Sequence, residues 1–182
     1  HHLWFSDADY ARKGNLIKWN PAVKTAADRD ALRAGLLDGA VDVVATDHAP
    51  HTLEEKERPY ASAPSGGPLV QHSLPMMLEL SAQGVLPVET VVEKMCHAPA
   101  RLFGVRDRGF LRTGHFADIV LVRPADPWTV SKENILYKCG WSPLEGTAFS
   151  HRIVRTLVNG RTVYADGRVD TAHRGAELEF DR

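Results

Sequence analysis

Residues 46–51 read Thr-Asp-His-Ala-Pro-His and concentrate groups that can do chemistry. Asp47 supplies a carboxylate, and His48 and His51 supply two imidazoles close behind it in the chain. Such a carboxylate can ligate a metal ion, act as a general base or orient an imidazole. The same pattern also fits an N-capping aspartate followed by exposed histidines. The residue types alone leave these roles open.

A short buried strand is predicted directly before Asp47. Residues 40–46 form an apolar, β-branched run of the kind found in parallel sheets. A helix is predicted at residues 26–37, with Thr25 as its N-cap and Gly39 as its C-cap. This alternation indicates an α/β fold, in which sites are built at the C-terminal ends of strands. Asp47 stands at such an end.

Two further helices are predicted at residues 70–83 and 88–103, and Gly104 closes the second. The pattern then changes to strands at 116–122, 152–158 and 161–164. Asn-Gly at 159–160 is a strong hairpin signal between the last two strands. We therefore predict an α/β part at 1–104 and a small β module at 105–182, with a mixed connector at 124–150.

The remaining segments are expected to be irregular. Residues 1–25 look loop-like, and within them Asn20 precedes a proline, so its side chain either contacts a ligand or stabilises a turn. Residues 52–70 form a long polar loop, a length typical of functional or mobile segments. The charged run at 54–57 is typical of a solvated face.

Composition excludes several classes of protein. Twenty-two basic and 23 acidic residues leave a net charge of −1, which argues against a nucleic-acid partner. No apolar run approaches the roughly 20 residues that span a bilayer, so no membrane partner is expected. There is no leader-like N-terminal pattern. Two cysteines do not form a disulfide framework, so a cytoplasmic location is expected.

Several motifs together resemble the C-terminal part of the dihydroorotases, which are cyclic amidohydrolases. The most specific is Ala-Thr-Asp-His-Ala-Pro-His-Thr at 45–52, supported by Asn-Pro-Ala-Val-Lys at 20–24 and Glu-Glu-Lys at 54–56. His-His-Leu at 1–3 resembles the end of the seventh barrel strand of that family. Residues 97–104 resemble the helix that leaves the barrel, and 114–120 and 158–160 resemble strands of its small β-sandwich. The resemblance covers essentially the whole chain.

The resemblance implies the C-terminal portion of a (β/α)8 barrel plus a small β-sandwich module. It implies an enzyme that interconverts N-carbamoyl-L-aspartate and L-dihydroorotate at a binuclear zinc centre. Asp47 matches the aspartate that ligates zinc and acts as general acid and base. Asn20 and His51 match substrate-binding residues, and Ser65 and Gly66 match the loop that closes over the substrate. The family often has Pro-Leu-Arg and Pro-Phe-Gly where this chain has Ala-Val-Lys at 22–24 and Pro-Ser-Gly at 64–66.

The other zinc ligands of that family are missing from this chain. We therefore expect the N-terminal half of the barrel to be a partner of this segment, and the segment alone to be inactive. The resemblance also implies a homodimer. Two alternatives stay open: a sibling hydrolase of cyclic ureides, such as a hydantoinase or allantoinase, and a non-catalytic dihydroorotase-like scaffold. Asp47 argues against the scaffold, which would typically have lost its metal ligands.

Overall fold

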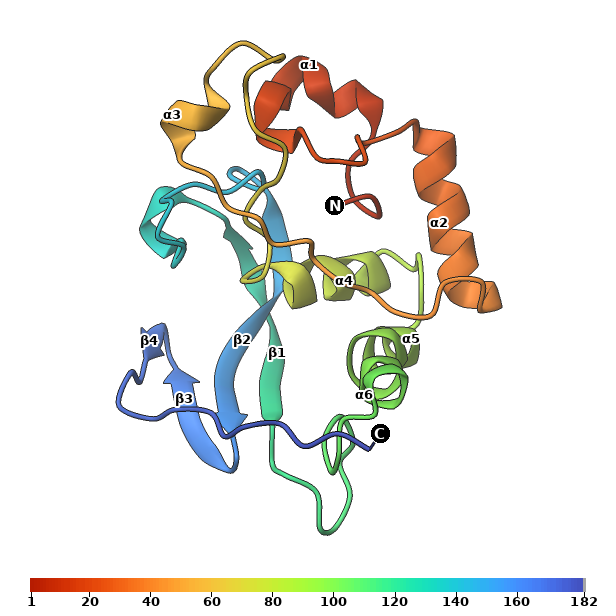
Figure 1. The fold of residues 1–182 in the computed structure, drawn as a ribbon, viewed down its shortest axis with the longest axis vertical. Coiled ribbons are helices and arrows are strands. Elements are labelled where there is room, and N and C mark those ends of the chain that lie inside the picture. The colour runs from red at the N-terminus through yellow and green to blue at the C-terminus, as the bar shows by residue number, and fades with distance from the viewer. Residues whose placement is uncertain (182) are drawn as a thin grey trace.

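The computed structural model describes residues 1–181 (Figure 1). Helices and short helical turns occupy residues 7–103, and the strands follow from residue 119 onward. In chain order the elements are 3-10 turns at Asp7–Asp9 and Gly14–Ile17 around α1 (Tyr10–Lys13), α2 (Ala26–Asp38), α3 (Leu53–Lys56), α4 (Ser73–Ala82), α5 (Val88–Val92), a π-helical turn (Glu93–His97), α6 (Ala98–Phe103), β1 (Ile119–Thr129), a 3-10 turn (Lys132–Asn134), β2 (Ala148–Val158), β3 (Arg161–Ala165) and β4 (Arg168–Val169).

Helix α2 confirms the helix predicted at 26–37, because local signals fix both of its ends. The Thr25 side chain accepts from the Asp28 backbone N–H, and the Asp28 carboxylate accepts from the Thr25 N–H. Gly39 follows the helix in the left-handed conformation, with φ of 90°. The predicted helix at 70–83 is α4. The predicted helix at 88–103 is one continuous helical stretch from α5 to α6, closed by left-handed Gly104.

The β module is a four-stranded antiparallel sheet in the order β1-β2-β3-β4. Val158 pairs with Arg161 across the predicted hairpin, and Asn159 and Gly160 both have positive φ, as the tight turn requires. The first strand is longer than expected. It runs through residues 124–129, which were predicted as connector, because the ladder with β2 resumes after an irregularity at Pro124.

Residues 40–46 were predicted to form a buried strand, and this prediction is wrong because the segment is not part of a sheet. Its backbone makes isolated hydrogen bonds, from Val41 N to Gly35 O at 2.9 Å and from Val44 N to Lys94 O at 3.0 Å. A strand is defined by a ladder of hydrogen bonds to a neighbour. Within residues 1–181 no second strand lies beside this segment, so its β-branched pattern has no ladder to join.

Two segments expected to be irregular contain short helices. Residues 1–25 include α1 between two 3-10 turns, and residues 52–70 include α3. Helix α3 begins at a second capping box, in which the Thr52 hydroxyl accepts from Glu55 N and the Glu55 carboxylate accepts from Thr52 N. Local capping bonds can therefore start a short helix in a segment whose sequence shows no helical periodicity.

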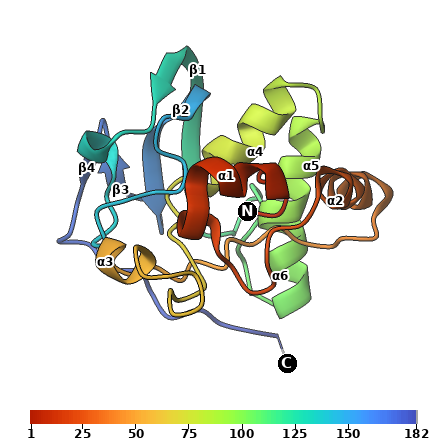
Figure 2. The ribbon, with the colours of Figure 1, turned by 90° about the horizontal axis from the view of Figure 1, so that it is seen from above.

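Helix α4 lies between the sheet and the other long helices, with the sheet on one side and α2, α5 and α6 on the other (Figure 1, Figure 2). The Glu79 carboxylate of α4 accepts from both the N–H and the hydroxyl of Ser150 on β2, each at 2.8 Å. Two apolar cores flank this helix. One contains Phe5, Ile17, Trp19, Val23, Leu69, Met76, Val130, Leu144 and Phe149. The other contains Leu36, Met77, Leu80, Leu86 and Val91.

The first of these cores combines residues from both parts that were predicted as domains. Val130, Leu144 and Phe149 come from the β module and pack with residues of the first 76 positions. The boundary between 104 and 105 stays a prediction. Trp19 and Leu69 of this core lie next to Asn20 and to the loop at 63–67, so the core anchors these two segments.

Candidate functional site

Asp47 ends the extended segment with an exposed side chain and a backbone φ of 48°. It precedes no helix directly, so the N-cap alternative for Asp47 is wrong; the cap of α3 is Thr52. Its carboxylate accepts no hydrogen bond from residues 1–181. Burial lowers the pKa of nearby His2, and the charge of Asp47 partly opposes that shift. The Asp47 carboxylate is therefore available to a ligand or a metal ion.

Three segments far apart in the sequence meet next to Asp47. His48 forms a parallel bridge with Gly67, and Ala49 N donates to Gly67 O at 3.3 Å. Gly66 N donates to Lys18 O at 2.9 Å, two residues before Asn20. The chain after Asp47, the loop at 63–67 and the segment before Asn20 therefore form one connected backbone unit.

Gly67 and Gly66 permit this close approach. A Cβ on Gly67 would lie 2.8 Å from Cζ2 of Trp19, a side chain that is 2% exposed. A Cβ on Gly66 would lie 2.7 Å from the Ala49 carbonyl oxygen, and Gly66 has φ of +118°. Both positions need glycine because the backbone packs directly on its neighbours.

His51 is brought against the same loop. Its Nε2 lies 3.1 Å from the Ser65 carbonyl oxygen, so Nε2 carries a hydrogen in this arrangement. The Glu55 carboxylate lies 3.6 Å from Nδ1. The buried Trp141 indole N–H donates to the His51 carbonyl at 2.8 Å. The position of His51 is thus fixed at its backbone by the β module and at its ring by the loop.

The other three predicted site residues differ in how their polar groups are used. Asn20 is exposed and forms no hydrogen bond with the rest of residues 1–181. It is joined to Pro21 by a cis peptide bond. The Gly66 N–H is already donated to Lys18 O. The half-buried Ser65 donates its N–H to no acceptor in the described chain. Asn20 and Ser65 therefore retain free donors, and Gly66 does not.

Lys56 is the residue that sequence reasoning missed. The run at 54–57 was expected to face solvent, but the Lys56 side chain is only 1% exposed. Its ammonium donates to three backbone carbonyls, those of Lys18, Pro64 and Gly66. Burial, assisted by the charge of Lys18, lowers the pKa of Lys56 to about 8. No local pattern signals this burial, since the Lys18 carbonyl lies 38 positions away in the sequence.

A metal ion would find one clear ligand here. In the described chain no group of three or more His, Cys, Asp and Glu side chains could hold a metal. A zinc site needs at least three protein ligands. The free Asp47 carboxylate suits one of those positions, and the remaining ligands would have to come from outside residues 1–181.

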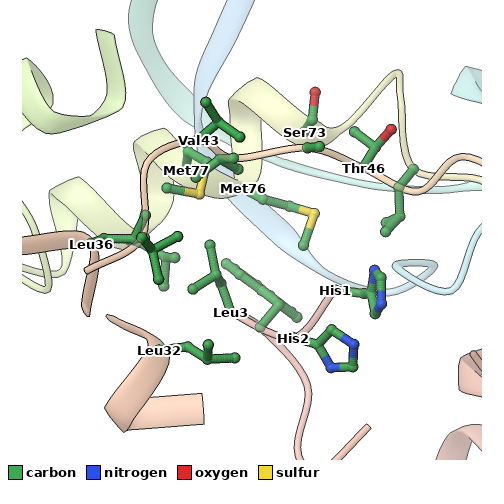
Figure 3. A pocket seen from close by; sticks show the side chains of 16 residues that line it. His1, His2, Leu3, Leu32, Leu36, Val43, Thr46, Ser73, Met76 and Met77 are labelled. Atoms are coloured by element: carbon green, nitrogen blue, oxygen red, sulfur yellow. The ribbon is translucent and has the colours of Figure 1, made fainter. Parts of the chain in front are cut away.

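A cavity of about 240 Å³ lies beside the extended segment, on the side of α2 and α4 (Figure 3). Its lining is mainly aliphatic and includes Leu36, Val43 and Met77, with His1, His2 and Thr46 at one end. None of the predicted substrate-binding residues lines it. An aliphatic cavity next to an unpaired extended segment suits additional packed chain better than a polar substrate.

No helix within residues 1–181 combines the length and the apolar character needed to cross a membrane.

The chain matches proteins of one family over almost its whole length. The Amidohydrolase family matches residues 5–163. The dihydroorotase of Halobacterium salinarum is 39% identical over 178 residues, which is 98% of this chain and 42% of that protein. The dihydroorotase of Pyrococcus furiosus is 33% identical over 178 residues, 98% of this chain and 41% of that protein. The chain thus spans about two fifths of the length of these relatives.

Solved structures of related proteins resemble this chain in fold. The L-hydantoinase (dihydropyrimidinase) from Arthrobacter aurescens superimposes with a TM-score of 0.86 at 32% identity, covering 93% of this chain and 39% of that one. A D-hydantoinase at 23% identity superimposes with a TM-score of 0.85, over 93% of this chain and 39% of that one, and shows the fold alone. The expected class, an α/β part of a barrel followed by a β module, is confirmed. With a family match over residues 5–163 and the motif resemblance supported by these relatives, the chain belongs to the amidohydrolase family.

Proposed function

We propose that this chain is the C-terminal part of a dihydroorotase, which hydrolyses the cyclic amide of L-dihydroorotate to N-carbamoyl-L-aspartate and catalyses the reverse ring closure. The observation that carries the proposal is the joining of three segments beside Asp47: those of Asn20, His51 and Ser65. The relatives at 39% identity that are named dihydroorotases support the same substrate.

The proposed roles follow from the groups that each residue leaves free. Asp47 has an unengaged carboxylate, which suits a metal ligand that also moves a proton from the attacking water to the leaving amide nitrogen. Asn20 and the Ser65 N–H offer hydrogen-bond donors to the carbonyl and carboxylate oxygens of the substrate. The ring nitrogens of His51 face the Ser65 carbonyl oxygen and the Glu55 carboxylate, so His51 would contact the substrate carboxylate by exchanging one of these partners for it. Gly66 contributes by its backbone shape.

Membership of the family implies a metal cofactor, and we propose that it is a binuclear zinc centre. Bound zinc would polarise the amide carbonyl and lower the pKa of its water toward about 7. Asp47 would be one ligand, and the others would come from the N-terminal half of the barrel. We further propose a homodimer in the cytoplasm; the two cysteines, both free thiols in the structure, agree with a reducing compartment.

A sibling activity is the second candidate, and one observation favours it. The Arthrobacter aurescens structure that matches at 32% identity is an L-hydantoinase (dihydropyrimidinase). Of the substrates of the two activities, only dihydroorotate carries a carboxylate on its ring; dihydrouracil and the smaller hydantoin ring lack it. The free donors of Asn20 and Ser65 favour the carboxylate-bearing substrate.

The test is turnover by the complete polypeptide that contains this chain, supplied with zinc and offered dihydroorotate, hydantoin and dihydrouracil. We expect dihydroorotate to be the preferred substrate and Asp47→Ala to lower kcat/KM by about 10³-fold or more, because a ligand and a proton carrier are lost together. Asp42→Ala is the matched control, since Asp42 is exposed on the same extended segment, and should keep full activity. Dialysis against a chelator should abolish turnover, and added zinc should restore it.

Absence of dihydroorotate turnover in the zinc-loaded parent protein would overturn the proposal. Turnover of hydantoin or dihydrouracil alone would establish the sibling activity. An inactive parent with all three substrates would favour the scaffold alternative.

A further inference from the structure

The Lys56 ammonium is buried without a carboxylate partner in the described chain. It donates to Gly66 O at 2.7 Å, Pro64 O at 3.0 Å and Lys18 O at 3.2 Å. Three N–H donors thus meet three carbonyl acceptors. A buried ammonium is costly unless each donor is satisfied, so this arrangement depends on the loop being folded over α3.

The three carbonyls belong to the segments that carry the proposed substrate contacts. Pro64 and Gly66 flank Ser65 on both sides, and Lys18 precedes Asn20 by two positions. Lys56 itself lies on α3, the helix that begins just after His51. One cation therefore ties together the loop, the Asn20 segment and the His51 segment.

The geometry of the peptide bond shows what this does to Ser65. In a trans peptide the C=O and the N–H point in opposite directions. Because the Pro64 carbonyl is directed at the Lys56 ammonium, the Ser65 N–H of the same peptide is directed away from it. That N–H is donated to no acceptor in residues 1–181. The Lys56 contact thus leaves one loop donor free and fixes its direction.

We propose that Lys56 is a positioning residue for substrate binding: by holding the carbonyls of Pro64 and Gly66, it orients the Ser65 N–H toward an oxygen of the bound substrate. This rests on the proposed function, because it takes the Ser65 loop as a substrate contact. Lys56 touches no reacting atom, so its loss should weaken binding of the ground state and the transition state alike.

The experiment measures KM and kcat for dihydroorotate with Lys56→Met in the complete zinc-loaded protein. Methionine keeps the apolar stem but removes all three donors. We expect KM to rise about tenfold or more, with kcat changed by less than about threefold. Lys56→Gln retains an amide donor on a shorter side chain, and its KM should lie between those of the other two proteins. This variant also carries the test if Lys56→Met does not fold.

Lys94→Met is the matched control. Lys94 is also a buried lysine, 9% exposed, and its ammonium donates to the Val41 carbonyl at 2.5 Å, at the far end of the extended segment from His48. Its loss removes one buried ammonium–carbonyl contact without touching the loop, so KM and kcat should stay within about twofold of the parent. A KM within twofold of the parent for Lys56→Met, or an equal rise for Lys94→Met, would overturn the proposed role of Lys56.

Hydrogen exchange at the loop amides separates failure of this proposal from failure of the proposed function. In Lys56→Met the Gly66 amide, which donates to Lys18 O, should exchange at least tenfold faster, whereas Lys94→Met should leave its exchange rate unchanged. If the parent protein does not hydrolyse dihydroorotate, the proposed function fails, and this exchange result alone decides whether Lys56 orders the loop. Unchanged exchange at Gly66 in Lys56→Met would overturn the inference in either case.

Discussion

Gly66→Ala tests the close contact between the loop and the chain after Asp47. An alanine Cβ at this position would lie 2.7 Å from the Ala49 carbonyl oxygen and 2.8 Å from the Ala49 Cβ. The first of these is a backbone atom, so the loop or the segment at 48–50 must shift. The substitution also forces a side chain into φ of +118°, a region that L residues rarely adopt.

Gly84→Ala is the matched control for backbone strain. Gly84 also has positive φ, +74°, but a Cβ there meets nothing within 4 Å. Strain alone should cost about 1 kcal/mol at Gly84. At Gly66 the strain and the steric overlap together should cost about 3 kcal/mol, since overpacking adds roughly 1–3 kcal/mol. The difference between the two variants, about 2 kcal/mol, is the part due to the contact with Ala49.

The assay is urea denaturation of the complete protein and the two variants, followed by tryptophan fluorescence. Trp19 lies against Gly67 and reports on this region directly. A free energy of unfolding for Gly66→Ala that falls no further than that for Gly84→Ala would refute the contact. Gly66→Ala should also raise KM for the substrate, because the loop that carries Ser65 is displaced from His51.

Two further predictions concern buried charges and titrating groups away from this loop. Burial lowers the pKa of His72 to about 4, so between pH 6.5 and pH 4 the unfolded chain binds a proton that the folded chain does not, and stability falls as the pH drops. His72→Phe should remove about 2 kcal/mol of this pH dependence between pH 7 and pH 5, measured as the free energy of unfolding at the two pH values; parallel profiles for the two proteins would contradict it. Within residues 1–181, Asp118→Ala leaves Arg108, 8% exposed, with Asn159 Oδ1 as its one side-chain acceptor, and should cost about 2–3 kcal/mol in urea denaturation. A cost below about 0.5 kcal/mol, typical of surface positions, would show that the Arg108–Asp118 pair is not needed.

Local signals in the sequence predicted the elements that local interactions fix. Thr25, Asp28 and Gly39 set the ends of α2 because capping bonds join residues three or four positions apart. Asn159 and Gly160 set the hairpin because both residue types tolerate the positive φ that a two-residue hairpin turn requires. The motif at 46–51 likewise indicated the family, since its residue types and order are specific.

The assembly of the site depends on contacts that no local pattern encodes. Residues 40–46 have the composition of a strand, yet a strand also needs a neighbour, and none lies beside them in residues 1–181. The run at 54–57 has the composition of a solvated face, yet Lys56 is buried because the loop at 63–67 folds over it. The chemical groups, the family and the ends of the helices and the hairpin can thus be predicted from the amino-acid sequence. The meeting of Lys18, His51, Lys56 and Ser65 is visible in the folded chain alone, because backbone carbonyls carry no sequence signal and become specific partners when folding brings them together.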